Sequence, residues 1–192
     1  MKHLDRILQY SRMRRAARHL GSNIRVIDIG AHQGQLFHHM GSRLRAGFGI
    51  EPLLSERKQG KSYTLEPGFF PKTRPDTGDW DAITLLAVLE HIPREQHAAL
   101  TNACHELLKA GGRVIITVPS PFVDHILRIL KTFRLIDGMS LEEHFGFDPK
   151  DTVGIFAEPR FRLIRHERFQ FGLNNLYVFE KRPPAMDVRA VV

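Results

Sequence analysis

Short runs of β-branched residues that stop at glycine or proline are the feature that most constrains this chain. Arg25–Ile29 stops at Gly30, and Arg113–Val118 stops at Pro119. Such runs are typical of strands that are buried on both faces of a parallel sheet. Because helical patterns separate the successive runs, the sequence predicts an α/β sheet with helices on both faces. Right-handed crossovers then restrict the sheet to a few doubly wound topologies.

The remaining runs complete a mostly parallel sheet of seven strands. The strands are expected at residues 25–29, 48–51, within 61–80, 81–89, 113–118, 161–171 and 176–180. The helices are expected at residues 3–20, 35–44, 93–109 and 122–133, with one more starting at Asp148-Pro149. The last two strands are joined through Gly172, which predicts an antiparallel pair at the C-terminal end of the sheet.

Composition places the chain among soluble globular domains. Of its 192 residues, 42% are hydrophobic and 26% charged, which excludes a disordered or low-complexity protein. Its single cysteine, Cys104, excludes an internal disulfide and favours a reducing compartment, so we expect a cytoplasmic protein. The longest apolar run, around Ala82–Leu89, is too short to span a bilayer. The basic N-terminus lacks the apolar core of a secretory signal.

Positive charge is concentrated at the start of the chain. The net charge is +7, and residues 1–25 hold seven basic residues against only Asp5, a net charge of +6. Because the charge belongs to one segment, it does not indicate a nucleic-acid-binding face. Residues 1–22 are predicted to form a basic amphipathic helix that docks on a domain at 23–182 or lies weakly on an anionic membrane surface. Its modest apolar stripe favours docking, and residues 183–192 are expected to be a flexible tail.

A glycine-containing turn and two carboxylates predict a nucleoside-binding site. Asp28 precedes the turn between Gly30 and Gly34, which leads from the first strand into a helix. Glycine allows the backbone to approach a ligand closely, and the start of a helix presents free N–H groups. Glu51 ends the second strand 21 residues after Gly30, where a carboxylate accepts hydrogen bonds from ribose hydroxyls. Together these features predict an adenosine-type cofactor at the switch point of the sheet.

Four segments in sequence resemble the motifs of class I S-adenosylmethionine-dependent methyltransferases, in particular the small single-domain members. The segments are Val26–Gly34, Gly49–Pro52, Asp81–Pro93 and Leu107–Pro119. The resemblance extends over about residues 24–180 and implies a Rossmann-like fold with S-adenosyl-L-methionine as the cofactor. The sequence departs from the family at His32, where many members have glycine; this side chain would narrow the pocket beside the methionine end of the cofactor.

The resemblance also implies which residues bind the cofactor. They are Asp28, Gly30, Ala31, Gly34, Glu51, Pro52, Phe69, Ala87 and Val88. The first four would shape the pocket around the amino-acid part of the cofactor, and Glu51 would hold the ribose. Pro52 and Phe69 would contact the adenine. Ala87 and Val88 would lie beneath the methionine.

Two histidines are candidates for a general base, which a hydroxyl acceptor needs. His91 follows the fourth strand at the edge where ligands bind in such sheets, and its alternative role is to cap the next helix. His144 lies in the connection after the fifth strand, where the family builds its substrate cover; its alternative is an exposed loop residue. The other histidines form no metal-ligand pattern, so no metal is predicted.

The resemblance implies a small-molecule acceptor: a metabolite, a lipid-linked precursor or a sugar, methylated at oxygen or nitrogen. Nucleic acid is disfavoured because the Asp/Asn-Pro-Pro-aromatic motif is absent after the fourth strand and no proline precedes Cys104. The aromatic residues that would either line an acceptor pocket or pack a lid helix on the core are Phe122, Phe133, Phe145 and Phe147.

Other functions stay open at this point. One is a catalytically silent domain that keeps the fold and the cofactor, and another is an RNA methyltransferase. A nicotinamide-dependent oxidoreductase is disfavoured because His32 and Gln35 interrupt the Gly-x-Gly-x-x-Gly turn.

Overall fold

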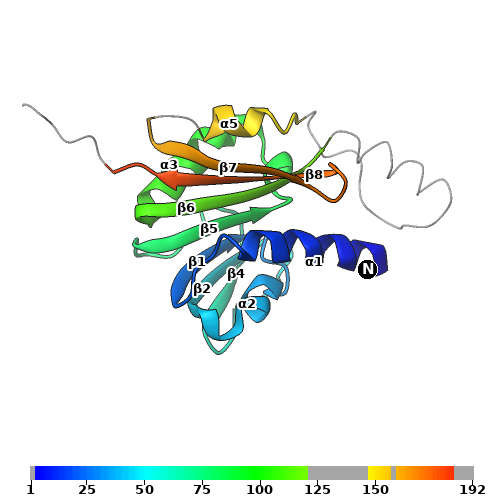
Figure 1. Cartoon of the computed structure of the whole chain (residues 1–192). Helices are drawn as coiled ribbons and strands as arrows, with labels where there is room; N and C mark the ends of the chain where they lie inside the picture. The colour runs from blue at the N-terminus through cyan, green and yellow to red at the C-terminus, as the bar shows by residue number, and fades with distance from the viewer. Residues whose placement is uncertain (1–2, 121–146, 157–158, 184–192) are drawn as a thin grey trace, which may run out of the picture.

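The computed structural model describes residues 3–120, 147–156 and 159–183 and shows one sheet with helices packed against it (Figure 1). The strands are β1 (Ile24–Ile29), β2 (Leu44–Glu51), β3 (Lys58–Gln59), β4 (Tyr63–Pro67), β5 (Trp80–Leu86), β6 (Leu108–Pro119), β7 (Phe161–Phe169) and β8 (Asn174–Lys181). The helices are α1 (His3–Ala17), α2 (Gln35–Met40), α3 (His97–Leu107) and α5 (Asp151–Ile155). Three short 3-10 turns are η1 (Gly41–Arg43), η2 (Leu89–His91) and η3 (Arg94–Gln96).

The strand order β3-β4-β2-β1-β5-β6-β8-β7 confirms the doubly wound, mostly parallel sheet. β1 pairs in parallel with both β2 and β5, so the order of strands reverses at β1. β8 lies antiparallel between β6 and β7, which confirms the C-terminal antiparallel pair. The sheet has eight strands rather than seven, because β3 adds an antiparallel pair of residues to β4. A strand of two residues is too short to show a periodic pattern.

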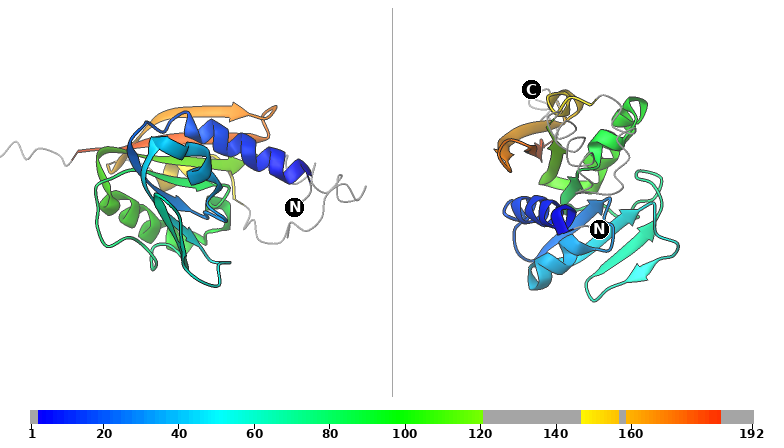
Figure 2. Two further views of the ribbon diagram at one scale, coloured as in Figure 1. Left: turned by 90° about the horizontal axis from the view of Figure 1, so that it is seen from below. Right: turned by 90° about the vertical axis from the view of Figure 1, so that its right-hand side faces the viewer.

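Neighbouring residues of the central strands are buried in two separate hydrophobic cores. Val26 and Ile115 pack with α1 and α2 on one face of the sheet. Ile27 and Ile116 pack with α3 on the other face, where Phe156 follows α5 (Figure 2). Because side chains alternate between the faces of a strand, a strand covered on both faces needs an uninterrupted apolar run. This explains the continuous runs of the sequence.

The N-terminal helix docks on the sheet, as its weak apolar stripe predicts. Met13 and Ala16 of α1 are buried in the core that α1 shares with α2, and Ala17 is buried as well. The helix ends at Ala17, three residues earlier than expected. Arg43 donates hydrogen bonds to the carbonyls of Ala17 at 2.9 Å, Leu20 and Gly21 at 3.2 Å. The guanidinium therefore satisfies carbonyls beyond the helix end and neutralises the partial negative charge there.

Replacing Arg43 by methionine is expected to lower the free energy of unfolding by about 1.5–3 kcal/mol, because charged hydrogen bonds to these carbonyls are lost. Urea denaturation measures this change. The matched control is Arg45→Met, since the Arg45 guanidinium is exposed and reaches only Asp81, at 3.9 Å. Its expected effect is below about 1 kcal/mol. Equal losses in the two variants would contradict the role of Arg43 at the end of α1.

The two helices at 35–44 and 93–109 are shorter than predicted. α2 ends at Met40 because Gly41 has φ 53 and ψ −123, which no helix continues. α3 begins only at His97, after the 3-10 turn η3. It ends before Leu108, whose buried side chain starts β6 opposite Trp80. Gly111, expected to end the helix, lies inside β6 at φ 71.

The helix expected at Asp148 is present. The backbone N–H of Lys150 donates to Asp148 Oδ1 at 2.9 Å, and α5 follows. Phe147, one of the aromatic residues singled out in the sequence, packs half-buried against the hydrophobic core. The predicted helix at 122–133 and the tail from 184 onward lie outside the described residues. In the part of the chain that the structure describes, no helix is long and apolar enough to cross a membrane.

Candidate active site

The turn after β1 is held tightly against the neighbouring strands. Gly30 has φ 78, and a Cβ on it would lie 2.4 Å from Val88 Cγ2, so only glycine fits. The backbone N–H groups of Gly30 and Ala31 both donate to the carbonyl of Ile50, at 2.9 and 3.1 Å. The turn is thus fixed between the ends of β2 and β5, at the switch point of the sheet.

The turn continues through His32 to Gly34 and into α2. His32 has φ 48, a left-handed conformation that favours glycine, which is the residue many family members have there. Its ring Nδ1 lies 2.9 Å from the Gln35 side-chain nitrogen. Gly34 has φ 77 and begins the helix, with its N–H donating to the Ala31 carbonyl at 2.8 Å.

Glu51 is the last residue of β2, and its carboxylate fixes the two loops beside it. The side chain is 8% exposed. One oxygen accepts the backbone N–H of His32 at 2.9 Å, and the other accepts that of Leu53 at 3.0 Å. A carboxylate accepts about four hydrogen bonds. Glu51 therefore keeps lone pairs for two further donors, which fits the pair of hydroxyls on a ribose.

Asp28 is a buried carboxyl group near the end of β1. It is 4% exposed, and the Thr84 hydroxyl donates to its Oδ1 at 2.6 Å. Burial raises the pKa of Asp28 to about 7, the Thr84 hydrogen bond opposes this rise, and the Glu51 charge adds to it. A carboxyl group whose pKa is raised to neutrality inside a pocket is characteristic of functional sites.

A cavity of about 40 Å³ lies between the turn and α1. Its lining residues are Gln9, Arg12 and Met13 of α1, with Asp28, Gly30, Ala31, Gln35, Leu36 and Leu86. His32 is not among them, so its side chain does not narrow this cavity. Ligand sites usually measure about 300–1,000 Å³. The cavity therefore has room for one end of a ligand only.

The end of β5 supplies the next predicted residues. Ala87 has φ 59, which ends the strand at Leu86, three residues earlier than expected. Its N–H still donates to the Thr117 carbonyl at 2.9 Å, so the backbone stays attached to β6. Val88 is half-buried with its side chain against Gly30.

Of the predicted site residues, Asp28, Gly30 and Ala31 line the cavity, and the other described ones do not. Pro52 is exposed, and Phe69 is 69% exposed. His91 is exposed in η2, and its N–H donates to the Val88 carbonyl at 3.0 Å. His144 lies outside the described residues. Among the ranges that the structure describes, no three His, Cys, Asp or Glu residues are grouped as metal ligands.

The residues that α1 and α2 contribute to the cavity were not among those predicted from the sequence. Gln35 and Leu36 follow Gly34 directly, so their position on the first turn of α2 was the available signal. Gln9, Arg12 and Met13 carry no such signal, because their place depends on how α1 docks. Arg12 is the important addition, since it brings a cation to a cavity that already contains the Asp28 carboxyl group.

Comparison with known proteins identifies the class. The model of a methyltransferase domain family matches residues 2–173. The chain belongs to this family and is a class I S-adenosylmethionine-dependent methyltransferase, and its sheet topology agrees with this.

Several relatives and structural neighbours carry the name methyltransferase. The ubiquinone biosynthesis O-methyltransferase of Pseudomonas aeruginosa is 25% identical over 188 residues, covering 84% of this chain and 79% of that protein. That of Dechloromonas aromatica is 34% identical over 104 residues, covering 48% and 43%. The N-methyltransferase NodS of Bradyrhizobium japonicum has the same fold, with a TM-score of 0.65 at 12% identity and coverage of 93% and 97%. The Burkholderia thailandensis 1,6-didemethyltoxoflavin-N1-methyltransferase, which was solved with S-adenosylhomocysteine, also has this fold. Its TM-score is 0.67 at 14% identity, and the match covers 92% of this chain and 79% of that chain.

Proposed function

We propose that this methyltransferase acts on a small molecule: a metabolite, a lipid-linked precursor or a sugar. The observation that carries the cofactor part of the proposal is that Asp28, the Gly30 turn and Glu51 meet where the neighbouring strands β1 and β2 end. The ubiquinone biosynthesis relatives carry the name O-methyltransferase, which supports oxygen over nitrogen as the methylated atom.

The residues at the edge fit S-adenosylmethionine. Glu51 would accept hydrogen bonds from the ribose hydroxyls with its remaining lone pairs. The amino-acid end would enter the cavity, with its ammonium group beside Asp28 and its carboxylate beside Arg12. The small volume of the cavity suits this end alone. The adenine would then lie along the open edge near Pro52 and Phe69.

The protein mainly orients the reactants and excludes water. S-adenosylmethionine supplies an electrophilic methyl group together with its leaving group. Gly30 and Val88 fix the floor of the site, and α1 covers it. For a hydroxyl acceptor, His91 is our first candidate to take the proton on a ring nitrogen, because it is exposed at the ligand edge after β5. His144 is the second candidate.

The outward surface of α1 and the residues just after it suggest a partner for this part of the chain. Ile7 is 62% and Tyr10 52% exposed, and Arg14 and Arg18 are exposed as well. This mixture supports weak contact with an anionic lipid surface, while nucleic acid stays disfavoured. The single, buried Cys104 supports a cytoplasmic location.

Thermal unfolding with S-adenosylmethionine, S-adenosylhomocysteine and NAD, each at saturating concentration, tests the cofactor assignment. A ligand at about a hundred times its dissociation constant stabilises the folded state by about 2.7 kcal/mol, which raises Tm by several degrees. We expect this shift with the two sulfur-containing nucleosides and none with NAD.

The acceptor is tested next with methyl-labelled cofactor and a panel of phenolic, hydroxylated-lipid and sugar acceptors. Label is expected on an oxygen of one of these compounds. A Tm shift without methyl transfer to any acceptor would favour a silent cofactor-binding domain instead. A shift with NAD alone would overturn the cofactor assignment.

A further inference from the structure

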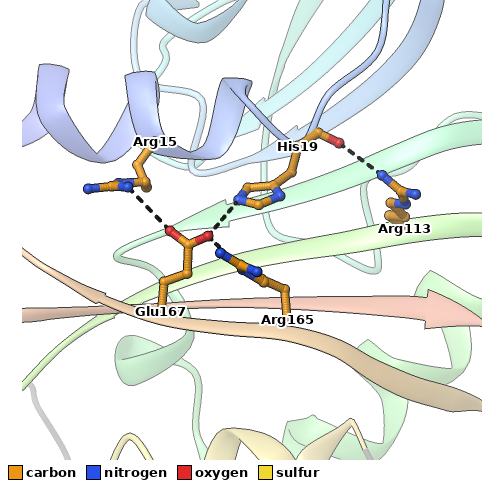
Figure 3. Close-up of polar contacts among 5 residues, drawn as sticks. All are labelled: Arg15, His19, Arg113, Arg165 and Glu167. Atoms are coloured by element: carbon orange, nitrogen blue, oxygen red, sulfur yellow. Dashed lines mark hydrogen bonds and ion pairs between the residues drawn. The ribbon is translucent and has the colours of Figure 1, made fainter.

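The Glu167 carboxylate on β7 contacts three basic residues near the C-terminal end of α1 (Figure 3). Its carboxylate lies 3.3 Å from the Arg15 guanidinium and 3.6 Å from the His19 ring. Arg165, on the same strand, donates to Glu167 at 2.8 Å. Arg113 of β6 donates to the His19 carbonyl at 3.5 Å, so a second strand is attached to the same stretch of chain.

The Glu167 carboxylate is charged at neutral pH and partly shielded from water. Its side chain is 16% exposed. The hydrogen bond from Arg165 lowers the pKa of Glu167 further than burial raises it, and the charges of Arg165, His19 and Arg15 lower it as well. Partly buried ion pairs that form a network contribute more than isolated surface pairs.

The same hairpin holds α1 at a second point. Gln170, just after β7, donates from its side chain to the Leu8 carbonyl at 3.3 Å. The Arg15 guanidinium of the first anchor also lies 5.6 Å above the ring of Phe169. β7 and the turn after it therefore contact α1 and the residues just beyond it, from Leu8 to His19.

The residues that α1 contributes to the cavity lie between these two anchors. Gln9, Arg12 and Met13 line the cavity, while Leu8 and Arg15 bind the hairpin on either side of them. Arg12 is one helical turn from Arg15. A shift of α1 relative to β7 therefore moves Arg12 relative to Asp28, which lies across the cavity.

We propose that Glu167 is a positioning residue that sets the affinity for the amino-acid end of the cofactor by holding α1 over the cavity. Glu167 does not line the cavity itself, so it acts through Arg15 and the turn of α1 that contains Arg12. The inference rests on the proposed placement of the cofactor. It predicts that loss of the anchor affects ligands with an amino-acid end and spares those without one.

Isothermal titration of the full chain with S-adenosylhomocysteine and with 5′-methylthioadenosine, which lacks the amino-acid end, tests this inference. In Glu167→Gln, the Kd for S-adenosylhomocysteine is expected to rise about five- to thirtyfold, because a charge-assisted contact to α1 is lost. The Kd for 5′-methylthioadenosine is expected to stay within about twofold. The amides of residues 8–17 are expected to exchange hydrogen faster than in the unchanged protein.

Glu180→Gln is the matched control, because Glu180 lies on the same hairpin and pairs only with Arg162, at 2.9 Å. It is expected to change neither Kd. Arg15→Gln removes the other side of the anchor and should reproduce the selective loss, also if Glu167→Gln folds poorly.

Equal weakening of both ligands would show general loosening of the fold and would overturn the inference. Unchanged affinity for S-adenosylhomocysteine in both anchor variants would overturn it as well. If the unchanged protein binds neither nucleoside, the proposed cofactor placement is what fails, and the inference falls with it.

Discussion

In Glu51→Gln, the affinity for S-adenosylhomocysteine is expected to fall about a hundredfold or more, because two charge-assisted hydrogen bonds to the ribose are each worth about 1.5–3 kcal/mol. The side chain also accepts the backbone N–H groups of His32 and Leu53. An amide has one acceptor oxygen, so glutamine cannot serve both N–H groups and the ribose as well. Isothermal titration measures the affinity, and circular dichroism at the same concentration checks that the fold is retained.

Glu106→Gln is the control for this substitution. Glu106 pairs with Arg74 at 2.8 Å on the surface of α3, and its side chain is 62% exposed. The affinity of Glu106→Gln for S-adenosylhomocysteine is expected to equal that of the unchanged protein. Wild-type affinity in Glu51→Gln would refute the assignment of Glu51 to the ribose.

Asp28→Asn is expected to stabilise the protein above pH 7 and to weaken cofactor binding. The pKa of Asp28 is raised from 3.8 to about 7, chiefly by burial, so between these values the folded state binds more protons than the unfolded state. Stability therefore falls as pH rises from about 4 to about 7, by about 1.4 kcal/mol for each pKa unit of difference. Asparagine cannot ionise, so this fall disappears, with a gain of about 4 kcal/mol at most above pH 7. Urea denaturation at pH 4.5, 6 and 8 measures the free energy of unfolding of the variant and of the unchanged protein.

Asp81→Asn is the control of opposite sign. Burial would raise the pKa of Asp81, but the Arg25 backbone N–H at 2.7 Å and the Lys109 ammonium at 2.5 Å lower it on balance. The stability that Asp81 contributes is present above its ordinary pKa and is lost as pH falls through the lowered value. Asp81→Asn should therefore destabilise the protein at neutral pH. Destabilisation above pH 7 by both substitutions would refute the raised pKa of Asp28.

The parts of the structure that the sequence predicts are those whose causes are local. Val26 and Ile27 alternate between two cores, so their strand shows a continuous apolar run. Gly30 is needed because the backbone touches Val88. Glu51 is the last residue of β2, and ligands bind at the edge where parallel strands end. Its place in the site can therefore be predicted from the strand pattern.

The parts that the sequence does not predict depend on contacts between distant segments. Arg12 lines the cavity only because α1 docks on the sheet, and one of the contacts to α1 comes from Glu167, far along the chain. The Arg43 guanidinium donates a hydrogen bond to the carbonyl at the end of α1, whereas the sequence around Arg43 predicts only an exposed arginine. Leu108 begins β6 because it fits beside Trp80, although the helical pattern continues past it. Tertiary packing overrides local propensity at each of these positions.

The contacts that α1 makes with β7 and the turn after it impose an order on how the chain folds. A nascent chain possesses the glycine turn and Glu51 once residue 51 has emerged from the ribosome, but the wall that α1 gives the cavity still lacks its anchors. Those anchors sit on β7 and the turn after it, and β7 joins the sheet only when β8 has inserted next to β6. Arg15 of α1 is therefore held by Glu167, 152 residues further along the chain. A chain cut before β7 would keep the glycine turn and Glu51 but would lose the contacts that hold α1 beside the cavity.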